Sequence, residues 1–303
     1  MTECERIIKE GILPESFFEE EVRCDFMVTT EMKKIWAIEL DLLIEFQRVA
    51  NIHNLHYFAF GGTLLGAVRH KGFIPWDDDV DIAMPMMDYL KLQEVAKKEF
   101  KEPYQLQSPY LDPGSYFSFL KLRNSRTTFA SRAFVAQSFN QGAFLDIFPL
   151  VECPPGKVKE QRNKIYPSIM KCSNYMKRGS EKFLTSQQLE RYNMFKTVSP
   201  MSEYELIQAE FDNPDYKNCG YYTHASLFFN IEEFHVWRKE CWNESVSSEF
   251  ENLQIPLPIG WDEILKEYYG DYMSLPPIKK RKTIHSDMII DMDRPYTEFL
   301  IKE

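Results

Sequence analysis

The sequence lacks the features that would place it in a membrane, in an oxidising compartment or in a zinc-finger class. Its longest apolar run, residues 57–68, covers 12 residues, whereas a helix that crosses a bilayer needs about 20. None of the six cysteines belongs to a C-x-x-C pair, which favours free, buried thiols in a reducing compartment. The charged residues 1–10 have no apolar core of the kind found in a secretory signal. We therefore expect a soluble, cytoplasmic protein.

Positive charge is also scarce. The chain has 36 Lys and Arg against 46 Asp and Glu, a formal net charge of -10, so net charge gives no reason to expect binding to nucleic acid. One basic run, Lys279–Lys282, leaves open a peripheral contact with an anionic membrane, with a solvated tail as the alternative. The 303 residues are 44% hydrophobic, enough for one large or two ordinary folded domains.

Helix and strand patterns alternate in the first half of the chain, which predicts an α/β (α+β) fold with a mixed sheet flanked by helices. The spacing of apolar residues predicts helices over 31–52, 64–70 and 87–100, and strands over 56–60, 80–84, 104–107, 116–122 and 143–148. After Pro154-Pro155-Gly156 the pattern becomes mainly helical, over 157–177, 185–209 and 261–269, with strand-like stretches at 220–224 and 228–236. We expect an N-terminal segment 1–30, a catalytic core 31–153 and an acceptor-shaping region 154–303.

A glycine turn followed by an acidic run is the most informative pattern. Gly61-Gly62-Thr63 ends an apolar strand, and the run Asp77-Asp78-Asp79-Val80-Asp81 places four carboxylates in five positions. Such like charges repel one another, and a packed fold gathers them where a cation neutralises them. Glycine lets backbone N–H groups approach phosphate oxygens closely. The two together predict a site for a metal ion and a phosphorylated donor.

The acidic residues follow strand spacing. Asp79 and Asp81 are two residues apart, so on a strand they lie on one face. Asp146 is a lone carboxylate within the apolar stretch Phe144–Phe148, where an unpaired charge would be costly. We expect Asp79, Asp81 and Asp146 to hold Mg²⁺ (or Mn²⁺), with Asp146 as a possible base. A structural hydrogen-bond or capping role is the alternative for Asp146.

Two plainer interpretations of the acidic run are a calcium loop and a solvated loop. Asp77, Asp79 and Asp81 match the start of an EF-hand, but position 6 is Ile82 instead of glycine and position 12 is Asp88 instead of glutamate. The sharp turn of a calcium loop therefore cannot form. A solvated loop does not explain the glycine turn beside it.

Further residues are candidates for donor binding, each with a structural alternative. Arg69 offers a bidentate phosphate clamp or a salt bridge to Asp77–Asp79, and Trp76 a stacking surface or a core side chain. Lys121 and Arg123 lie on one face of a strand and are either phosphate ligands or ordinary surface cations. The remaining candidates are Asp78, in the acidic run, and His285, which alone is more often structural.

These motifs carry a family resemblance. Residues 60–69 with 72–82, then Asp88-Tyr89, Lys121-Leu122-Arg123, Asp146–Leu150 and the late stretch 268–277 with His285 resemble the LicD family, the bacterial phosphocholine transferases that also include the fukutin-related proteins. The resemblance spans residues 31–286, and its first block is highly specific.

The resemblance implies a nucleotidyltransferase-like fold and a metal-dependent transfer of a phosphorylated head group. The usual reaction moves phosphocholine from CDP-choline to a sugar hydroxyl of a cell-surface glycan, such as lipopolysaccharide, capsule or teichoic acid, and releases CMP. It also implies that Asp79, Asp81 and Asp146 form the acidic trio. Two other functions stay open, namely transfer of NMP from an NTP and a non-catalytic role in glycan assembly.

Overall fold

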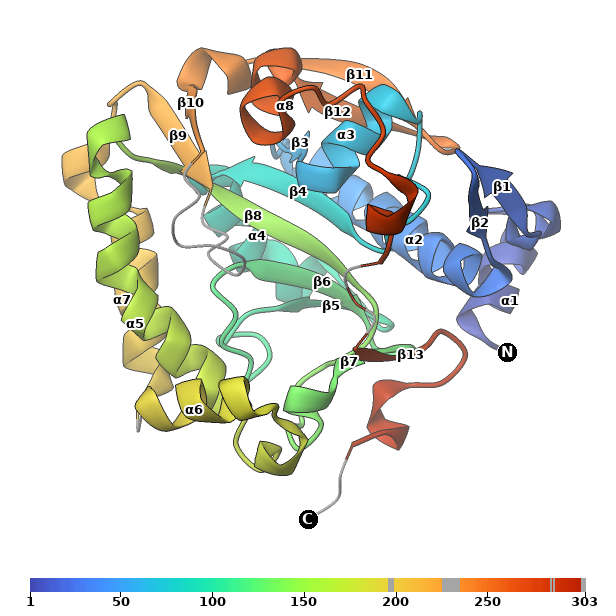
Figure 1. The fold of residues 1–303 in the computed structure, drawn as a ribbon, viewed down its shortest axis with the longest axis horizontal. Helices are drawn as coiled ribbons and strands as arrows, with labels where there is room; N and C mark the ends of the chain where they lie inside the picture. Colours follow the sequence, from blue (N-terminus) through green and yellow to red (C-terminus); the bar gives the residue numbers. More distant parts are fainter. Residues whose placement is uncertain (196–198, 225–234, 284, 286, 301–303) are drawn as a thin grey trace.

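The computed structural model describes residues 1–195, 199–224, 235–283, 285 and 287–300. A mixed sheet of seven strands forms its centre, in the order β10–β9–β8–β4–β3, with β6 paired to β8 and β5 paired to β6 (Figure 1). The long strand β8 (Phe144–Glu152) runs parallel to β4 (Val80–Pro85) and antiparallel to β6 (Leu120–Asn124) and β9 (Tyr221–His224). The other members are β3 (Phe58–Ala59), β5 (Tyr104–Gln107) and β10 (Val236–Arg238). The predicted fold class is confirmed.

Helices of the first half pack against this sheet. Helix α2 (Thr30–His53) begins after Thr29, whose side chain accepts a hydrogen bond from the Met32 amide. Its buried apolar stripe contacts β6 and β8, and α4 (Met86–Glu99) contacts β4, β5 and β8. Both helices lie behind the sheet in Figure 1. The three helices predicted in this half, including α3 (Gly61–Arg69), are confirmed within a few residues.

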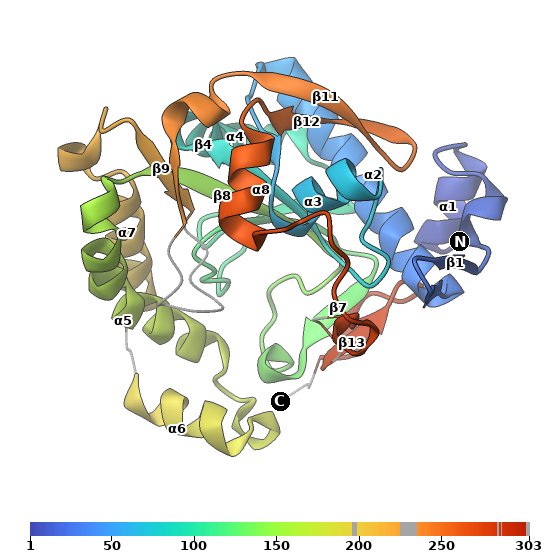
Figure 2. The same cartoon turned by 45° about the horizontal axis from the view of Figure 1, so that its top comes forward.

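Helices of the second half form a separate wall. Helices α5 (Val158–Met176) and α7 (Pro200–Phe211) lie side by side at one edge of the molecule in both views (Figures 1 and 2). The helical stretch predicted over 185–209 is two helices, α6 (Ser186–Met194) and α7. Pro200 starts the second one, because proline has no amide N–H and disfavours helix in the residue before it. Residues 196–198 lie outside the described chain.

Strand boundaries depend on pairing partners that periodicity does not reveal. The strand predicted over 116–122 is β6, Leu120–Asn124, because its partner β5 places Tyr104 opposite Asn124. Most of the strand expected at 228–236 falls outside the described residues; Val236 begins β10. Three strand pairs are not predicted: β1 (Glu21–Arg23) with β2 (Phe26–Val28), β7 (Thr128–Ser131) with β13 (Met288–Asp291), and β11 (Ser245–Phe250) with β12 (Leu253–Pro258).

All six cysteines are free thiols, as predicted. Four of them are buried, but the expectation of burial is wrong for Cys24, which is exposed, and Cys219 is half-buried. Among the described residues, no helix has both the length and the apolar character needed to cross a bilayer.

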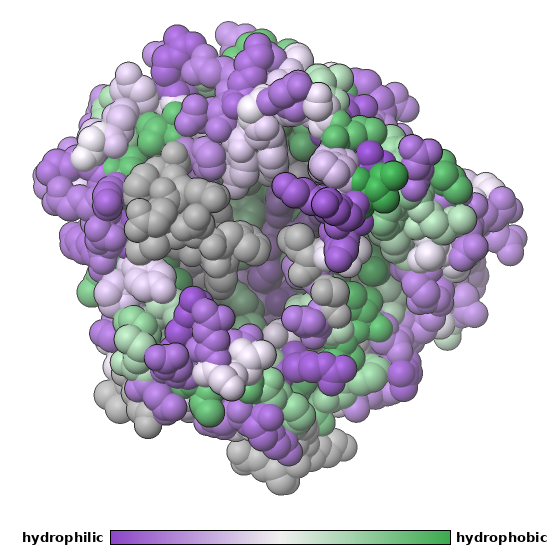
Figure 3. Space-filling view, in the orientation of Figure 1, coloured by the Kyte–Doolittle hydropathy of each residue, from purple (hydrophilic) through white to green (hydrophobic). Residues whose placement is uncertain are grey.

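One face of the molecule is hollowed. A pocket of about 670 Å³ lies between the sheet, α5, α6 and the helix α8 (Trp261–Tyr269), and Figure 3 shows the hollow with hydrophilic residues along part of its edge. Strands β9 and β10, which follow the expected boundary at residue 153, extend the same central sheet. Residues on both sides of that boundary also line the pocket, so both halves of the chain build it.

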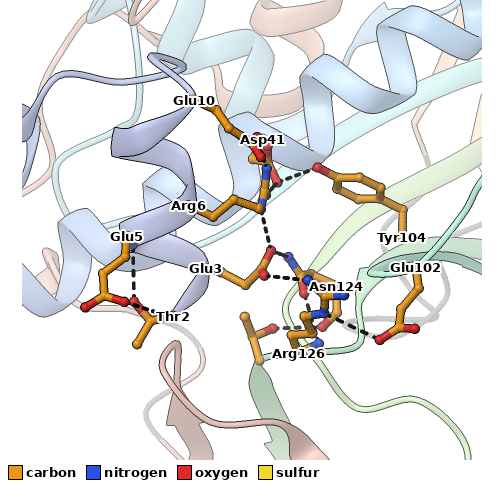
Figure 4. A network of polar contacts seen from close by, with 11 residues as sticks. Thr2, Glu3, Glu5, Arg6, Glu10, Asp41, Glu102, Tyr104, Asn124 and Arg126 are labelled. Atoms are coloured by element: carbon orange, nitrogen blue, oxygen red, sulfur yellow. Dashed lines mark hydrogen bonds and ion pairs between the residues drawn. The ribbon is translucent and has the colours of Figure 1, made fainter.

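The N-terminal helix is tied to the core by a polar network (Figure 4). Arg6 of α1 (Glu3–Lys9) donates to Asp41 of α2 at 2.5 Å, and the Tyr104 hydroxyl donates to the same Asp41 oxygen at 2.9 Å. Glu3 accepts a hydrogen bond from Asn124 of β6 at 3.0 Å. Residues 1–10 are thus anchored to two elements that also support the sheet beneath the pocket.

Candidate functional site

The acidic residues gather where two parallel strands begin. Asp81 is the second residue of β4 and Asp146 the third of β8, and the two are register partners in the parallel ladder. Asp79 immediately precedes β4, and the carboxylates of all three line the pocket. Strand pairing thus brings together a trio that is 67 residues apart in sequence, between Asp79 and Asp146.

The glycine turn makes room for these carboxylates. Gly61 has φ +50°, a conformation that favours glycine, and a Cβ on it would lie 2.8 Å from the Asp81 Oδ2. A Cβ on Gly62 would lie 2.4 Å from the Asp77 Oδ2. Thr63 supports the same arrangement, because its hydroxyl accepts a hydrogen bond from the Asp81 amide at 2.8 Å. The turn at the start of α3 therefore fits around the acidic run itself.

Asp77 belongs to the acidic site, although the sequence analysis did not assign it a role there. Its ligand oxygen, with those of Asp78 and Asp79, forms a group whose atoms all lie within 4.8 Å of one another. Burial raises the pKa of Asp77 and Asp81 well above the ordinary value, and neighbouring carboxylates raise it further. Burial also raises the pKa of Asp79 to about 6, despite the opposing charge of His285. This donor set fits a hard divalent cation, whose charge would relieve the repulsion.

Asp146 has a protein partner. The Lys121 Nζ lies 2.5 Å from the Asp146 Oδ1, and both side chains are no more than 10% exposed. Burial lowers the pKa of Lys121, although Asp146 opposes the shift. The ammonium also lies 3.7 Å from the centre of the Phe144 ring. Lys121 is therefore not an ordinary surface cation, and Asp146 has one oxygen left to face the pocket.

Arg123 is a second buried cation on the same face of β6. Its Nε donates to Gln107 at 2.7 Å and its Nη1 donates to the Gly142 carbonyl at 2.6 Å. Burial lowers the pKa of Arg123 to about 10. Since a guanidinium carries five N–H donors, further donors have no hydrogen-bond partner among the described residues and are available to a ligand in the pocket.

Asp78 and His285 form an ion pair. The His285 Nδ1 lies 2.9 Å from the Asp78 Oδ1, and Asp78 is buried. Burial lowers the pKa of His285, but the Asp78 hydrogen bond and the charges of Asp79 and Asp78 outweigh it, so the pKa is raised. His285 lines the pocket whereas Asp78 does not. The structure thus gives Asp78 the task of holding His285.

Arg69 is not placed as predicted. Its Nη1 donates to the Tyr272 carbonyl at 2.6 Å and its Nε donates to His70 at 2.9 Å. It neither lines the pocket nor forms an ion pair with Asp77–Asp79. The predicted salt bridge of Arg69 to Asp77–Asp79 is therefore wrong, and its role as a phosphate clamp stays a prediction. The segment after α8 passes close to the end of α3, and its backbone carbonyls accept hydrogen bonds from the guanidinium.

Trp76 lines the pocket and is also largely buried, with edge contacts to Phe26 and His70. Trp76 is therefore a core side chain, and one of its surfaces also faces the pocket. Several other lining residues have no predicted role in donor binding. These are Tyr268 and Tyr269 of α8, Phe117, Phe134 and Phe139, Ser173 and Lys177, and Lys280 and Lys282.

Comparison with known proteins agrees with this site. Residues 54–167 match the family model described as the nucleotidyltransferase domain of LicD/FKTN/FKRP, a stretch that contains the glycine turn and every carboxylate above. The lipopolysaccharide cholinephosphotransferase LicD of Haemophilus influenzae is 29% identical over 271 residues, which cover 84% of this chain and 97% of that protein. An uncharacterized protein of Rickettsia prowazekii is 51% identical over 43 residues, 14% of this chain and 16% of its own. One of Rickettsia typhi is 46% identical over 50 residues, 16% of each chain.

Proposed function

We propose that the chain is a member of the LicD family, whose nucleotidyltransferase domain matches residues 54–167, and that it transfers phosphocholine from CDP-choline to a sugar hydroxyl of a cell-surface glycan. The observation that carries the proposal is the gathering of Asp77, Asp79, Asp81 and Asp146 on one wall of a pocket that also holds Arg123. The Haemophilus influenzae relative, 97% of whose length is aligned with this chain, is a lipopolysaccharide cholinephosphotransferase. A lipopolysaccharide is therefore the first acceptor to test.

A divalent ion, Mg²⁺ or Mn²⁺, fits the acidic wall. Asp77, Asp79 and Asp81 would hold it, and Asp146 lies beside them as the register partner of Asp81. Bound there, the ion would supply positive charge against the donor diphosphate and the CMP leaving group. Burial and the charges of neighbouring carboxylates raise the pKa of Asp77 and Asp81, and a bound cation would oppose this shift.

The protein's own groups have separate tasks in the displacement. Arg123 donates its remaining N–H groups to donor phosphate oxygens, held in position by Gln107 and the Gly142 carbonyl. Asp146 accepts the proton of the sugar hydroxyl through the oxygen that Lys121 does not bind. The sugar oxygen then bonds to the phosphorus of phosphocholine, while that phosphorus loses its bond to the bridging oxygen, which leaves with CMP.

The test is ³¹P NMR of the full chain with Mg²⁺ and CDP-choline, with and without lipopolysaccharide, repeated with EDTA. We expect metal-dependent formation of CMP and of a new phosphodiester signal. Asp79→Asn and Asp81→Asn should abolish both signals, whereas Asp215→Asn at an exposed surface position should not. Full turnover by either site variant would contradict the assignment.

The same assay with other donor substrates distinguishes between the remaining candidate functions. Turnover with CDP-ribitol or CDP-glycerol, but not with CDP-choline, would keep the site and change the head group. Release of pyrophosphate from an NTP would indicate the nucleotidyltransferase alternative. Binding of divalent ions without any turnover would favour the non-catalytic role in glycan assembly.

A further inference from the structure

The basic run Lys279–Lys282 lies beside the pocket instead of extending into solvent as a tail. It follows α8 and includes the end of a 3₁₀ turn, Ile278–Lys280, which lies in front of the sheet in Figure 1. Lys280 and Lys282 line the pocket, whereas Lys279 and Arg281 do not. The backbone therefore directs every second cation of the run toward the site.

Two anchors fix this segment. The Arg281 Nη1 donates to the Cys24 carbonyl at 2.6 Å, its Nε donates to the Pro276 carbonyl at 2.9 Å, and its guanidinium carbon lies 5.2 Å from the centre of the Trp76 ring. On the other side of Lys282, His285 is paired with Asp78 at 2.9 Å. Because both anchors bind the body of the protein, the two lysines are held at the pocket rim.

The two lysines have no carboxylate partner within the part of the chain that the structure describes. Both are exposed, and no ion pair forms at either ammonium. Lys121, in contrast, is already paired with Asp146. The rim therefore offers two free ammonium groups to a ligand that enters the pocket, and an ammonium on a flexible stem is a common phosphate ligand.

We propose that Lys280 and Lys282 form a phosphate-binding rim of the pocket. The inference rests on the proposed function, and the ligand is a phosphate group of a substrate. That phosphate belongs either to the CDP moiety of the donor or to a phosphorylated glycan acceptor. Fixed ammonium groups at the entrance would also offset the negative charge of the acidic wall for an approaching anion.

The experiment compares the double variant Lys280→Ala/Lys282→Ala with Lys279→Ala in the full chain. Lys279 is an adjacent exposed lysine that does not line the pocket. Its substitution therefore removes the same kind of charge from the same segment without changing the pocket rim. The probes are inorganic pyrophosphate and CDP-choline, titrated calorimetrically with Mg²⁺ present. We expect the double variant to bind at least one probe about tenfold more weakly, as loss of two exposed charge-assisted contacts implies. Lys279→Ala should bind as the wild type does.

A second comparison tells whether the phosphate group bound by the two lysines belongs to the donor or to the glycan acceptor. Weaker binding of both probes assigns the rim to the donor. If both probes bind normally, the KM for a phosphorylated glycan is compared with that for the same glycan after phosphatase treatment. A KM increase confined to the phosphorylated glycan assigns the rim to the acceptor. In either case Lys280→Arg/Lys282→Arg should restore binding.

Normal probe binding together with unchanged KM values for both glycans would overturn the proposal. Pyrophosphate binding is measured without turnover, so this arm stays informative if CDP-choline is not the donor. Failure of the proposed transfer reaction would instead appear as the absence of CMP in the wild type, irrespective of the rim variants.

Discussion

The Lys121 ammonium and the Asp146 carboxylate face each other at 2.5 Å across adjacent antiparallel strands, with both side chains nearly buried. Strand β6 supplies the cation and β8 the anion, so the pair joins two strands of the sheet at the floor of the pocket. A buried pair of this kind is costly to break from one side, because the remaining charge loses its partner without regaining water.

Removing one member of this pair should therefore destabilise the protein more than removing both. In EDTA, we expect Lys121→Met to lower the free energy of unfolding by about 3 kcal/mol. Lys121→Met/Asp146→Leu should recover a large part of that loss. Urea denaturation of the two single variants and the double variant measures the coupling. If the two single losses simply add in the double variant, the pair contributes no coupling and the interpretation fails.

Glu39 is a further buried acid, and the charges of the acidic run act on it. It lies on α2 with no exposed surface, and neither of its carboxylate oxygens has a hydrogen-bond partner among the described residues. Burial raises its pKa well above the ordinary 4.5, and the charges of Asp79, Asp78, Asp77 and Asp81 add to this shift. The protonated form of Glu39 is therefore favoured over a wider pH range in the folded protein than in the unfolded chain.

This raised pKa gives a pH dependence with a defined sign. Above pH 4.5 the unfolded chain releases the Glu39 proton while the folded chain keeps it, so the free energy of unfolding falls as pH rises. Glu39 lowers the free energy of unfolding by at most about 1.4 kcal/mol for each pH unit of increase. The substitution Glu39→Gln removes this pH dependence. We expect the variant to gain stability over the wild type from pH 5 to pH 8 in EDTA. Glu31→Gln, on the same helix but 77% exposed, is the control; an equal gain there would contradict the prediction.

Gly62 should be intolerant of a methyl group for a reason specific to the site. A Cβ would lie 2.4 Å from the Asp77 Oδ2, the end of a flexible side chain that can shift. Gly62→Ala should therefore keep the fold and displace Asp77, with about a tenfold loss of Mg²⁺ affinity. Gly156→Ala, where a Cβ meets nothing within 4 Å, should bind Mg²⁺ normally. Calorimetry measures both affinities, and an unchanged value for Gly62→Ala would exclude Asp77 from the site.

The sequence predicts the acidic wall well because its information is local. Asp79 and Asp81 follow the two-residue period of a strand, and Asp146 is conspicuous as a charge within an apolar stretch. Asp77 lies three residues before the strand begins, and its place depends on the Gly62 turn. Its assignment therefore required the path of the loop.

The cations are harder to predict because their partners come from distant segments. Lys121 and Arg123 could be placed on one face, but their partners on β8 and β5 depend on strand order. The salt bridge predicted for Arg69 is wrong for the same reason, since the carbonyl that accepts its hydrogen bond belongs to Tyr272, 203 residues away. The pocket role of Lys280 depends on where the chain crosses after α8, which no local pattern encodes.

Mg²⁺ itself should stabilise the protein through the acidic wall. A ligand at 100 times its Kd adds about 2.7 kcal/mol to the folded state, which for a chain of this size corresponds to an increase in Tm of about 5 °C. Asp79→Asn/Asp81→Asn should lose this increase, while Asp215→Asn keeps it. In EDTA the double variant should melt above the wild type, because it relieves the repulsion that raises the pKa of Asp81. Differential scanning calorimetry at constant ionic strength tests both statements, and a Mg²⁺ response retained by the double variant would place the metal elsewhere.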